Sequence, residues 1–206
     1  MIIERLPLGI YAANCYIVGC EKTKEAAVID PSGEHEEILK KLEELGLDLK
    51  YIILTHGHGD HIGGLIHLKR KSEVPILIHE EDKEMLIDAE KNLSSQMSIP
   101  DVELNPDDVI EDGDIINIGE LEMMVIHTPG HTKGSISLKI DDNIITGDTL
   151  FAGSIGRTDL YGGSYEDIIL SINEKIMVYD DDVKVFPGHG PHSTIGKERI
   201  SNQFIK

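Results

Sequence analysis

The sequence contains no tryptophan and only two cysteines, Cys15 and Cys20. The two cysteines have four residues between them and there is no second pair, which excludes a disulfide scaffold and a four-cysteine zinc site. We expect both to be buried thiols in a protein from a reducing compartment. Aromatic residues make up only 4% of the chain. The core must therefore be built mainly from Ile, Leu and Val.

Positive charge is also scarce. The chain has 19 Lys and Arg residues against 38 Asp and Glu residues, which gives a net charge of -19. Such a charge repels nucleic acid and anionic membrane surfaces, so we expect neither as a partner. An anionic small molecule would need a local cationic group to bind.

Long apolar runs are absent. No run approaches the roughly 18 residues that indicate a membrane span, and the N-terminal MIIERLPLGI lacks the cationic and apolar regions of a signal peptide. We expect a cytoplasmic protein that is a monomer or a small homo-oligomer. A chain of 206 residues suits one domain over residues 1–206 with a sizeable core.

The spacing of apolar residues changes between strand-like and helix-like along the chain. Two segments lack a clear period, Asn92–Pro106 and the glycine-rich Phe151–Gly163, which we expect to be irregular. The predicted helices are a helix that carries Ile38 to Leu45 and ends at Gly46, Leu65–Lys69, a segment from about Glu80, and a segment after Ser164, which begins a capping-box pattern. The predicted strands are Ile2–Leu6, Cys15–Gly19, Ala26–Asp30, Tyr51–Leu54, Ile76–Ile78, Asp114–Ile118, Leu121–His127, Ser135–Ile140, Asn143–Thr146 and Val183–Phe186.

These elements alternate in both halves of the chain, with two short connections that are typical of antiparallel hairpins, at Gly119-Glu120 and Asp141-Asp142. Periodicity alone supports an α/β or α+β fold. A four-layer αββα sandwich of two mixed sheets fits this order of elements.

A cluster of polar residues follows the apolar strand at Tyr51–Leu54. Its sequence is His56-Gly57-His58-Gly59-Asp60-His61. Three imidazoles and a carboxylate within six residues cannot all enter a core, because each buried polar group needs a partner. A loop at a strand end can bring them to a metal ion, and the small glycines allow the tight backbone that this requires.

Three later residues extend this pattern. His131 lies in Pro129-Gly130-His131-Thr132 before a predicted strand, and Asp148 and His189 each follow one, in Gly147-Asp148-Thr149 and Pro187-Gly188-His189-Gly190. Each has Gly or Pro beside it at a strand end, where ligands are held over a rigid scaffold. Four other histidines have no such pattern, and we expect surface or core roles for His35, His67, His79 and His127.

This constellation resembles the metallo-β-lactamase superfamily over nearly the whole chain. The resemblance implies a four-layer αββα fold and two divalent metal ions. His56, His58 and His131 would bind the first ion, Asp60, His61 and His189 the second, and Asp148 would bridge them. It also implies that Asp60 and Asp148 serve catalysis by holding the ions that activate a water molecule. Imidazole and carboxylate ligands suit zinc, iron and manganese; zinc is the expected metal.

Within the superfamily, the bridging Asp148 differs from the cysteine ligand usual in true β-lactamases. Gly147-Asp148-Thr149-Leu150-Phe151 and Pro187-Gly188-His189-Gly190 resemble glyoxalase II, the hydroxyacylglutathione hydrolase, and the ending PHSTIGKERISNQFI resembles its shorter bacterial relatives. The resemblance implies a hydrolase of small thioesters such as hydroxyacylglutathione. Only 17 residues follow His189, so we expect no C-terminal helical glutathione-binding domain.

A second departure is Gly156-Arg157-Thr158-Asp159, where glyoxalase II has a Gly-Lys-x-Tyr element. Arg157 is the candidate substrate-binding residue; its alternative role is an ion pair with Asp159 that stiffens the loop. Persulfide dioxygenases share both this fold and the Gly-Arg-Thr-Asp element. In that alternative, one iron would be held by His58, His131 and Asp148.

Overall fold

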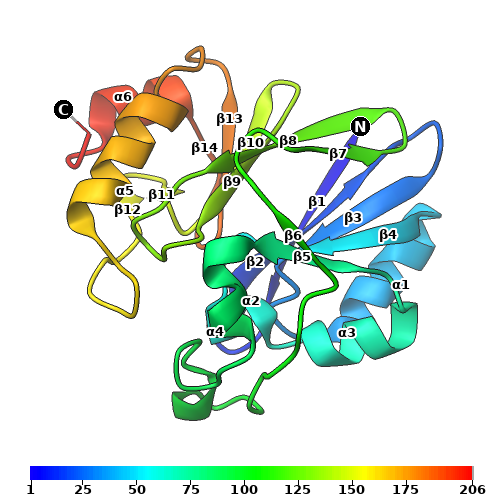
Figure 1. Ribbon diagram of the computed structural model, residues 1–206. Coiled ribbons are helices and arrows are strands. Elements are labelled where there is room, and N and C mark those ends of the chain that lie inside the picture. The colour runs from blue at the N-terminus through cyan, green and yellow to red at the C-terminus, as the bar shows by residue number, and fades with distance from the viewer. Residues whose placement is uncertain (206) are drawn as a thin grey trace.

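The structure, a computed structural model, describes residues 1–205. Two six-stranded sheets lie at its centre (Figure 1). The first has the order β1-β2-β3-β4-β5-β6 and is made of β1 (Ile2–Leu8), β2 (Ala13–Gly19), β3 (Glu25–Ile29), β4 (Asp48–Ile53), β5 (Ile76–His79) and β6 (Asp108–Ile110). The second has the order β14-β13-β10-β9-β8-β7 and is made of β7 (Ile115–Ile118), β8 (Leu121–His127), β9 (Ile136–Ile140), β10 (Asn143–Gly147), β13 (Lys184–Pro187) and β14 (Ser193–Thr194).

Both sheets are mixed. In the first, β1, β2 and β3 pair antiparallel, and β3 to β6 pair parallel. In the second, only β10 and β13 pair parallel. The predicted hairpins are confirmed, since Ile118 pairs with Leu121 and Ile140 pairs with Asn143. Gly119 and Asp141 turn the chain with positive φ.

Helices cover the outer face of each sheet (Figure 1). Those beside the first sheet are α1 (His35–Leu45), α2 (Gly59–Ile62), α3 (Leu65–Ser72) and α4 (Lys83–Leu86), with short 3₁₀ turns η1 (Glu80–Asp82) and η2 (Ser94–Gln96). Those beside the second sheet are α5 (Tyr165–Ser171), its π-helical continuation η3 (Ile172–Ile176) and α6 (Ile195–Ser201).

Three apolar clusters fill the spaces between these layers. The first packs α1 and α3 against one sheet through residues such as Ile38 and Leu68, and the third packs α5 and η3 against the other through Ile168 and Ile172. The second cluster lies between the two sheets and contains Ile53 from the first sheet and Val125 and Leu138 from the second. The four-layer αββα fold is therefore confirmed, with a core of mostly Ile, Leu and Val.

The structure corrects two sequence-based expectations and adds elements that the sequence did not predict. Gly59–Ile62, which we expected as part of a loop, forms the single helical turn α2. The segment Phe151–Gly163 is not entirely a loop, because β11 (Leu150–Phe151) pairs with β12 (Ser154–Ile155). Helix α6 and the short strands β6 and β14 had no sequence signal that we recognised.

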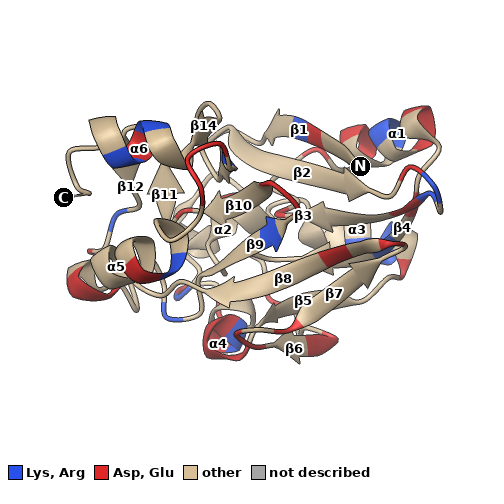
Figure 2. Ribbon diagram, turned by 90° about the horizontal axis from the view of Figure 1, so that it is seen from above, with Lys and Arg blue, Asp and Glu red and all other residues tan. Residues whose placement is uncertain are grey.

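The expectation that both cysteines are buried thiols is confirmed, because Cys15 and Cys20 are buried and form no disulfide. Figure 2 shows Asp and Glu residues on the outer helices α1, α4 and α5. No helix among residues 1–205 is long and apolar enough to cross a membrane.

Candidate metal centre

The seven side chains singled out by the motifs surround one site. His56 and His58 follow β4, and Asp60 and His61 lie on α2 directly after them. The remaining three come from the other sheet, where they lie just beyond β8, β10 and β13: His131, Asp148 and His189. Strand ends from both sheets thus meet here, which is why residues 133 positions apart come together.

The first ligand set is His56, His58 and His131, whose candidate donor atoms lie within 4.8 Å of one another. All three residues are buried. His58 Nδ1 lies 2.9 Å from His131 Nε2. Metal–nitrogen bonds of about 2.0–2.1 Å place neighbouring donor atoms about 3–3.4 Å apart, so this spacing suits a shared ion.

The second ligand set is Asp60, His61 and His189, whose donor atoms also lie within 4.8 Å. His189 Nε2 lies 3.2 Å from Asp60 Oδ2 and 3.3 Å from His61 Nε2. His61 is fully buried, and the other two are partly exposed. An ion held here would therefore have one side open to the surface.

Asp148 lies between the two ligand sets. Its Oδ1 is 3.3 Å from His61 Nε2, outside hydrogen-bond geometry, and its Oδ2 is 3.6 Å from His131 Nε2 and 3.7 Å from His189 Nε2. Gly188 makes room for it, because a Cβ there would lie 2.1 Å from Asp148 Oδ1. The two carboxylate oxygens are thus placed to serve both sets.

Three buried side-chain atoms among the described residues lack a hydrogen-bond partner, and all belong to this centre: His56 Nε2, His58 Nε2 and Asp148 Oδ1. Burying polar atoms without partners costs free energy. A cation bound by His56 Nε2 and Asp148 Oδ1 would remove two of these deficits. The donor set therefore fits divalent metal ions.

The electrostatics of the two sets differ. Burial and neighbouring imidazoles lower the pKa of His56 well below its ordinary value and the pKa of His58 to about 3. Burial also lowers the pKa of His61, but the Asp148 and Asp60 carboxylates outweigh it and leave that pKa raised. Burial raises the pKa of Asp148, but the imidazoles of His61, His131 and His189 together outweigh burial and leave that pKa lowered. Protons therefore compete with a cation for His61 more than for His56 or His58.

Asp30 contacts the second ligand set through His61. This buried carboxylate accepts hydrogen bonds from Thr55 N (2.7 Å) and Thr55 Oγ1 (2.6 Å), and Asp30 Oδ2 lies 3.0 Å from His61 Nδ1. A carboxylate on the far nitrogen fixes the orientation of a ligating imidazole. The motifs did not predict this role. The sequence does hold a hint of it, because Asp30 is a charged residue directly after the apolar strand β3.

The segment that carries His189 is held by the first strands of the chain. Asn14 Nδ2 donates to Pro187 O (2.8 Å) and Gly190 O (3.0 Å), and Asn14 N donates to Gly188 O (2.7 Å). Tyr16 Oη also donates to Pro187 O, at 2.7 Å. Strand β2 therefore fixes the backbone on both sides of this ligand.

A cavity of about 460 Å³ opens onto the metal centre. Arg157 lines it, but its guanidinium makes a bidentate ion pair with Asp159, with both N–O distances 2.7 Å. This pair lowers the pKa of Asp159 to about 2. Arg157 also contributes its backbone carbonyl, which lies 2.8 Å from His131 Nδ1. The structure thus places Arg157 at the site with its charge already balanced.

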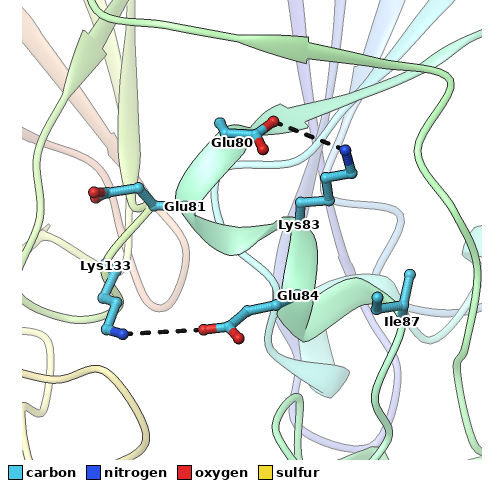
Figure 3. A pocket seen from close by; sticks show the side chains of 6 residues that line it. All are labelled: Glu80, Glu81, Lys83, Glu84, Ile87 and Lys133. Carbon is cyan, nitrogen blue, oxygen red and sulfur yellow. Dashed lines mark ion pairs between the residues drawn. The ribbon is translucent and has the colours of Figure 1, made fainter.

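A second hollow, of about 430 Å³, lies beside α4 (Figure 3). Its charged groups pair with one another, Glu80 with Lys83 and Glu84 with Lys133, each at 4.0 Å. Glu81 also lies near His79 and His127. Those two imidazoles stack with centroids 4.0 Å apart and planes 12° from parallel. Because nitrogen lone pairs lie in the ring plane, stacked rings cannot point them at one ion, so we assign no metal here.

Comparisons with known proteins agree with this geometry. The family model of the metallo-beta-lactamase superfamily matches residues 8–189. The chain is 37% identical to the hydroxyacylglutathione hydrolase GloC of Haemophilus influenzae, covering 100% of this chain and 98% of the relative. It is 38% identical to the probable metallo-hydrolase YqgX of Bacillus subtilis, covering 98% and 96%.

Solved structures are also similar. The BLEG-1 B3 metallo-beta-lactamase superposes with a TM-score of 0.93 at 33% identity, covering 100% of both chains. TTHA1623 in a di-iron-bound form superposes with a TM-score of 0.85 at 30% identity, covering 98% of this chain and 100% of that one. From its sequence, its fold and the metal-ligand geometry together, the chain belongs to the metallo-beta-lactamase superfamily and is a metallo-hydrolase.

Proposed function

We propose that the protein is a dinuclear metal-dependent thioester hydrolase that acts on hydroxyacylglutathione-like thioesters. The observation that carries the proposal is the pair of ligand sets sharing Asp148 at the base of one cavity. The full-length similarity to a hydroxyacylglutathione hydrolase supports the thioester as substrate. Zinc is the expected metal, while iron and manganese also suit this donor set.

In this proposal, His56, His58 and His131 would hold one ion, and Asp60, His61 and His189 would hold the other. Asp148 would be a ligand of both. When bound, such ions polarise a carbonyl group and lower the pKa of a water molecule to near neutrality.

Three carboxylates of the protein would hold the ions and orient their ligands. Asp60 and Asp148 would be its catalytic carboxylates, because Asp60 would bind the second ion and Asp148 lies between the two ligand sets. Asp30 keeps the Nδ1 proton of His61 in place, so that Nε2 faces the ion. The leaving thiolate needs no general acid, since thiol pKa values lie near 8.5.

The test is hydrolysis of S-lactoylglutathione by protein loaded with zinc, iron or manganese in parallel. We expect turnover with two equivalents of metal bound. The absence of turnover with every metal would refute hydroxyacylglutathione as the substrate.

The alternative, a mononuclear iron persulfide dioxygenase, is tested by oxygen uptake with glutathione persulfide. It rests on the Gly156-Arg157-Thr158-Asp159 element. A mononuclear iron enzyme would leave the second ligand set without an ion, although the donor atoms of Asp60, His61 and His189 lie within 4.8 Å of one another. The dinuclear hydrolase uses all seven side chains, so it is the function that the geometry supports better.

A further inference from the structure

The cavity above the metal centre is mostly apolar. Besides the metal ligands, its wall consists of Tyr11, Leu93, Met97, Phe151, Ile155 and Leu160, with Ser154 and Arg157. Several of these apolar side chains are only partly buried, so they present hydrocarbon surface to the cavity. A volume of about 460 Å³ is in the range of small-molecule sites.

The charge at this cavity does not favour an anionic group away from the metals. Arg157 is the cation in its wall, and Asp159 neutralises it. Bound metal ions would act on the reacting carbonyl, at the base of the cavity. A thiol carrier with carboxylates would keep them in water, since an unpaired buried charge is costly. The acyl half of the substrate is therefore the half that enters.

The position of Leu93 supports a built apolar wall. Leu93 has φ 69°, a left-handed conformation that is rare for a bulky side chain. Its neighbour Asn92 fixes this turn, because Asn92 Nδ2 donates to Met85 O (2.9 Å) and Val102 O (2.8 Å), and Asn92 Oδ1 accepts from Ser94 N (2.9 Å). Backbone strain maintained by surrounding contacts is typical of functional sites.

The strained turn is also joined to the metal centre. Gly59 N donates to Asn92 O at 2.7 Å, and a Cβ at Gly59 would lie 2.9 Å from Met97 Sδ. The turn therefore packs directly on the motif that supplies Asp60 and His61.

We propose that this cavity binds the hydrocarbon chain of an acyl thioester, so that the substrates are thioesters of short apolar acyl groups in preference to lactoyl thioesters. The proposal rests on the thioester hydrolase function proposed above and changes the preferred acyl group from a hydroxyacyl group to a hydrocarbon chain. Each methylene that enters the cavity should raise kcat/KM by about threefold to fourfold until the cavity is filled.

The experiment compares S-acetyl-, S-butanoyl-, S-hexanoyl- and S-lactoylglutathione with the metal-loaded enzyme, so that only the acyl half changes. We expect kcat/KM to be at least tenfold higher for hexanoyl than for acetyl. Leu93→Asn should reduce that ratio severalfold, because asparagine tolerates the left-handed backbone but removes the apolar wall. Leu170→Asn, an equivalent change on the exposed face of α5, should leave the ratio unchanged.

Two other results are informative. A flat series, or a preference for lactoyl, would overturn this inference and leave the hydrolase function standing. No hydrolysis of any of the four compounds would overturn both.

A different observation assigns a positioning role to Asp82, which the structure places behind the first ligand set. Its carboxylate is fully buried and accepts three hydrogen bonds, from Gly57 N (3.0 Å), Gly134 N (2.7 Å) and Thr132 Oγ1 (2.7 Å). Gly57 lies between two ligands of the set, and Thr132 directly follows the third. One side chain thus ties together both segments that carry the first ligand set.

The close approach at Gly134 shows how tightly this contact is built. A Cβ there would lie 2.5 Å from Asp82 N and 2.8 Å from the Asp82 side chain. We infer that Asp82 sets the spacing between the His56–His58 segment and His131, and hence the metal affinity of the first ligand set.

The test is metal titration of Asp82→Asn and of Thr132→Val; the second variant removes only one of the three hydrogen bonds to Asp82 and is the milder change at that carboxylate. We expect Asp82→Asn to weaken one of the two metal equivalents by about tenfold to a hundredfold, and Thr132→Val to weaken the same equivalent less. Asp101→Asn, at an exposed position, is the control. If folded Asp82→Asn binds both metal equivalents with wild-type affinity, Asp82 is purely structural and the inference is wrong.

Discussion

Replacing Asp30 by alanine removes a buried carboxylate that three groups contact: Thr55 N, Thr55 Oγ1 and His61 Nδ1, at 2.7, 2.6 and 3.0 Å. Each buried polar group left without a partner costs about 1–3 kcal/mol. The three losses share one site and are not additive, so we expect a decrease of about 3–6 kcal/mol in the free energy of unfolding. This is a large fraction of the roughly 5–15 kcal/mol typical of a native protein.

The assay is urea unfolding of the chelator-treated protein, so that metal binding does not contribute to the measured free energy. Asp142→Ala, in the exposed β9–β10 turn, is the matched control and should change stability by less than about 0.5 kcal/mol. A loss below about 1 kcal/mol for Asp30→Ala would refute the reasoning, because the three donors would then have found other partners.

Further predictions concern the metals and Arg157. Asp148→Ala should abolish turnover and lower the bound metal below two equivalents, measured by elemental analysis, whereas His67→Ala should do neither; equal losses would mean that the ligands are wrongly assigned. Acidification should release the ions in two steps, because the raised pKa of His61 lets protons compete at the second ligand set at a higher pH than at the first. Loss of both ions at one pH, in stepwise dialysis, would contradict this. Arg157→Ala should raise KM for S-lactoylglutathione less than about threefold, since exposed ion pairs contribute little, and Asp159→Asn should lower that KM by freeing the guanidinium. A large KM increase in Arg157→Ala would show that Arg157 binds substrate despite its partner.

Most strands and both hairpins could be predicted from the sequence, because the spacing of apolar residues and the positions of turn residues indicate the same elements. The strand at Tyr51–Leu54 could be recognised since it is fully apolar and is followed at once by polar residues. The ligand motifs stood out for the same reason: His56 and Asp148 each come directly after an apolar strand, where a buried polar group needs a partner.

Other features depend on tertiary contacts that no local pattern encodes. Helix α2 has four residues, two of them with side chains directed to a metal centre, so it has no apolar period to detect. Asp82 accepts from the backbone of Gly57 and Gly134, and glycine identity does not indicate what its N–H contacts. The Arg157–Asp159 pair was one of two roles that the sequence allowed, and only geometry distinguishes a balanced charge from a free one.

The hydrogen bonds from Asn14 and Tyr16 to the Pro187–Gly190 segment span sequence separations of 171 to 176 residues. Contacts this distant carry a loop-closure cost before they contribute stability, and they slow folding. During synthesis, β2 emerges from the ribosome long before its partner segment, so the second ligand set cannot assemble until nearly the whole domain has been translated. The last histidine of the first ligand set, His131, is translated 58 residues before His189. The three histidines of the first ligand set are therefore synthesised before the second ligand set is complete.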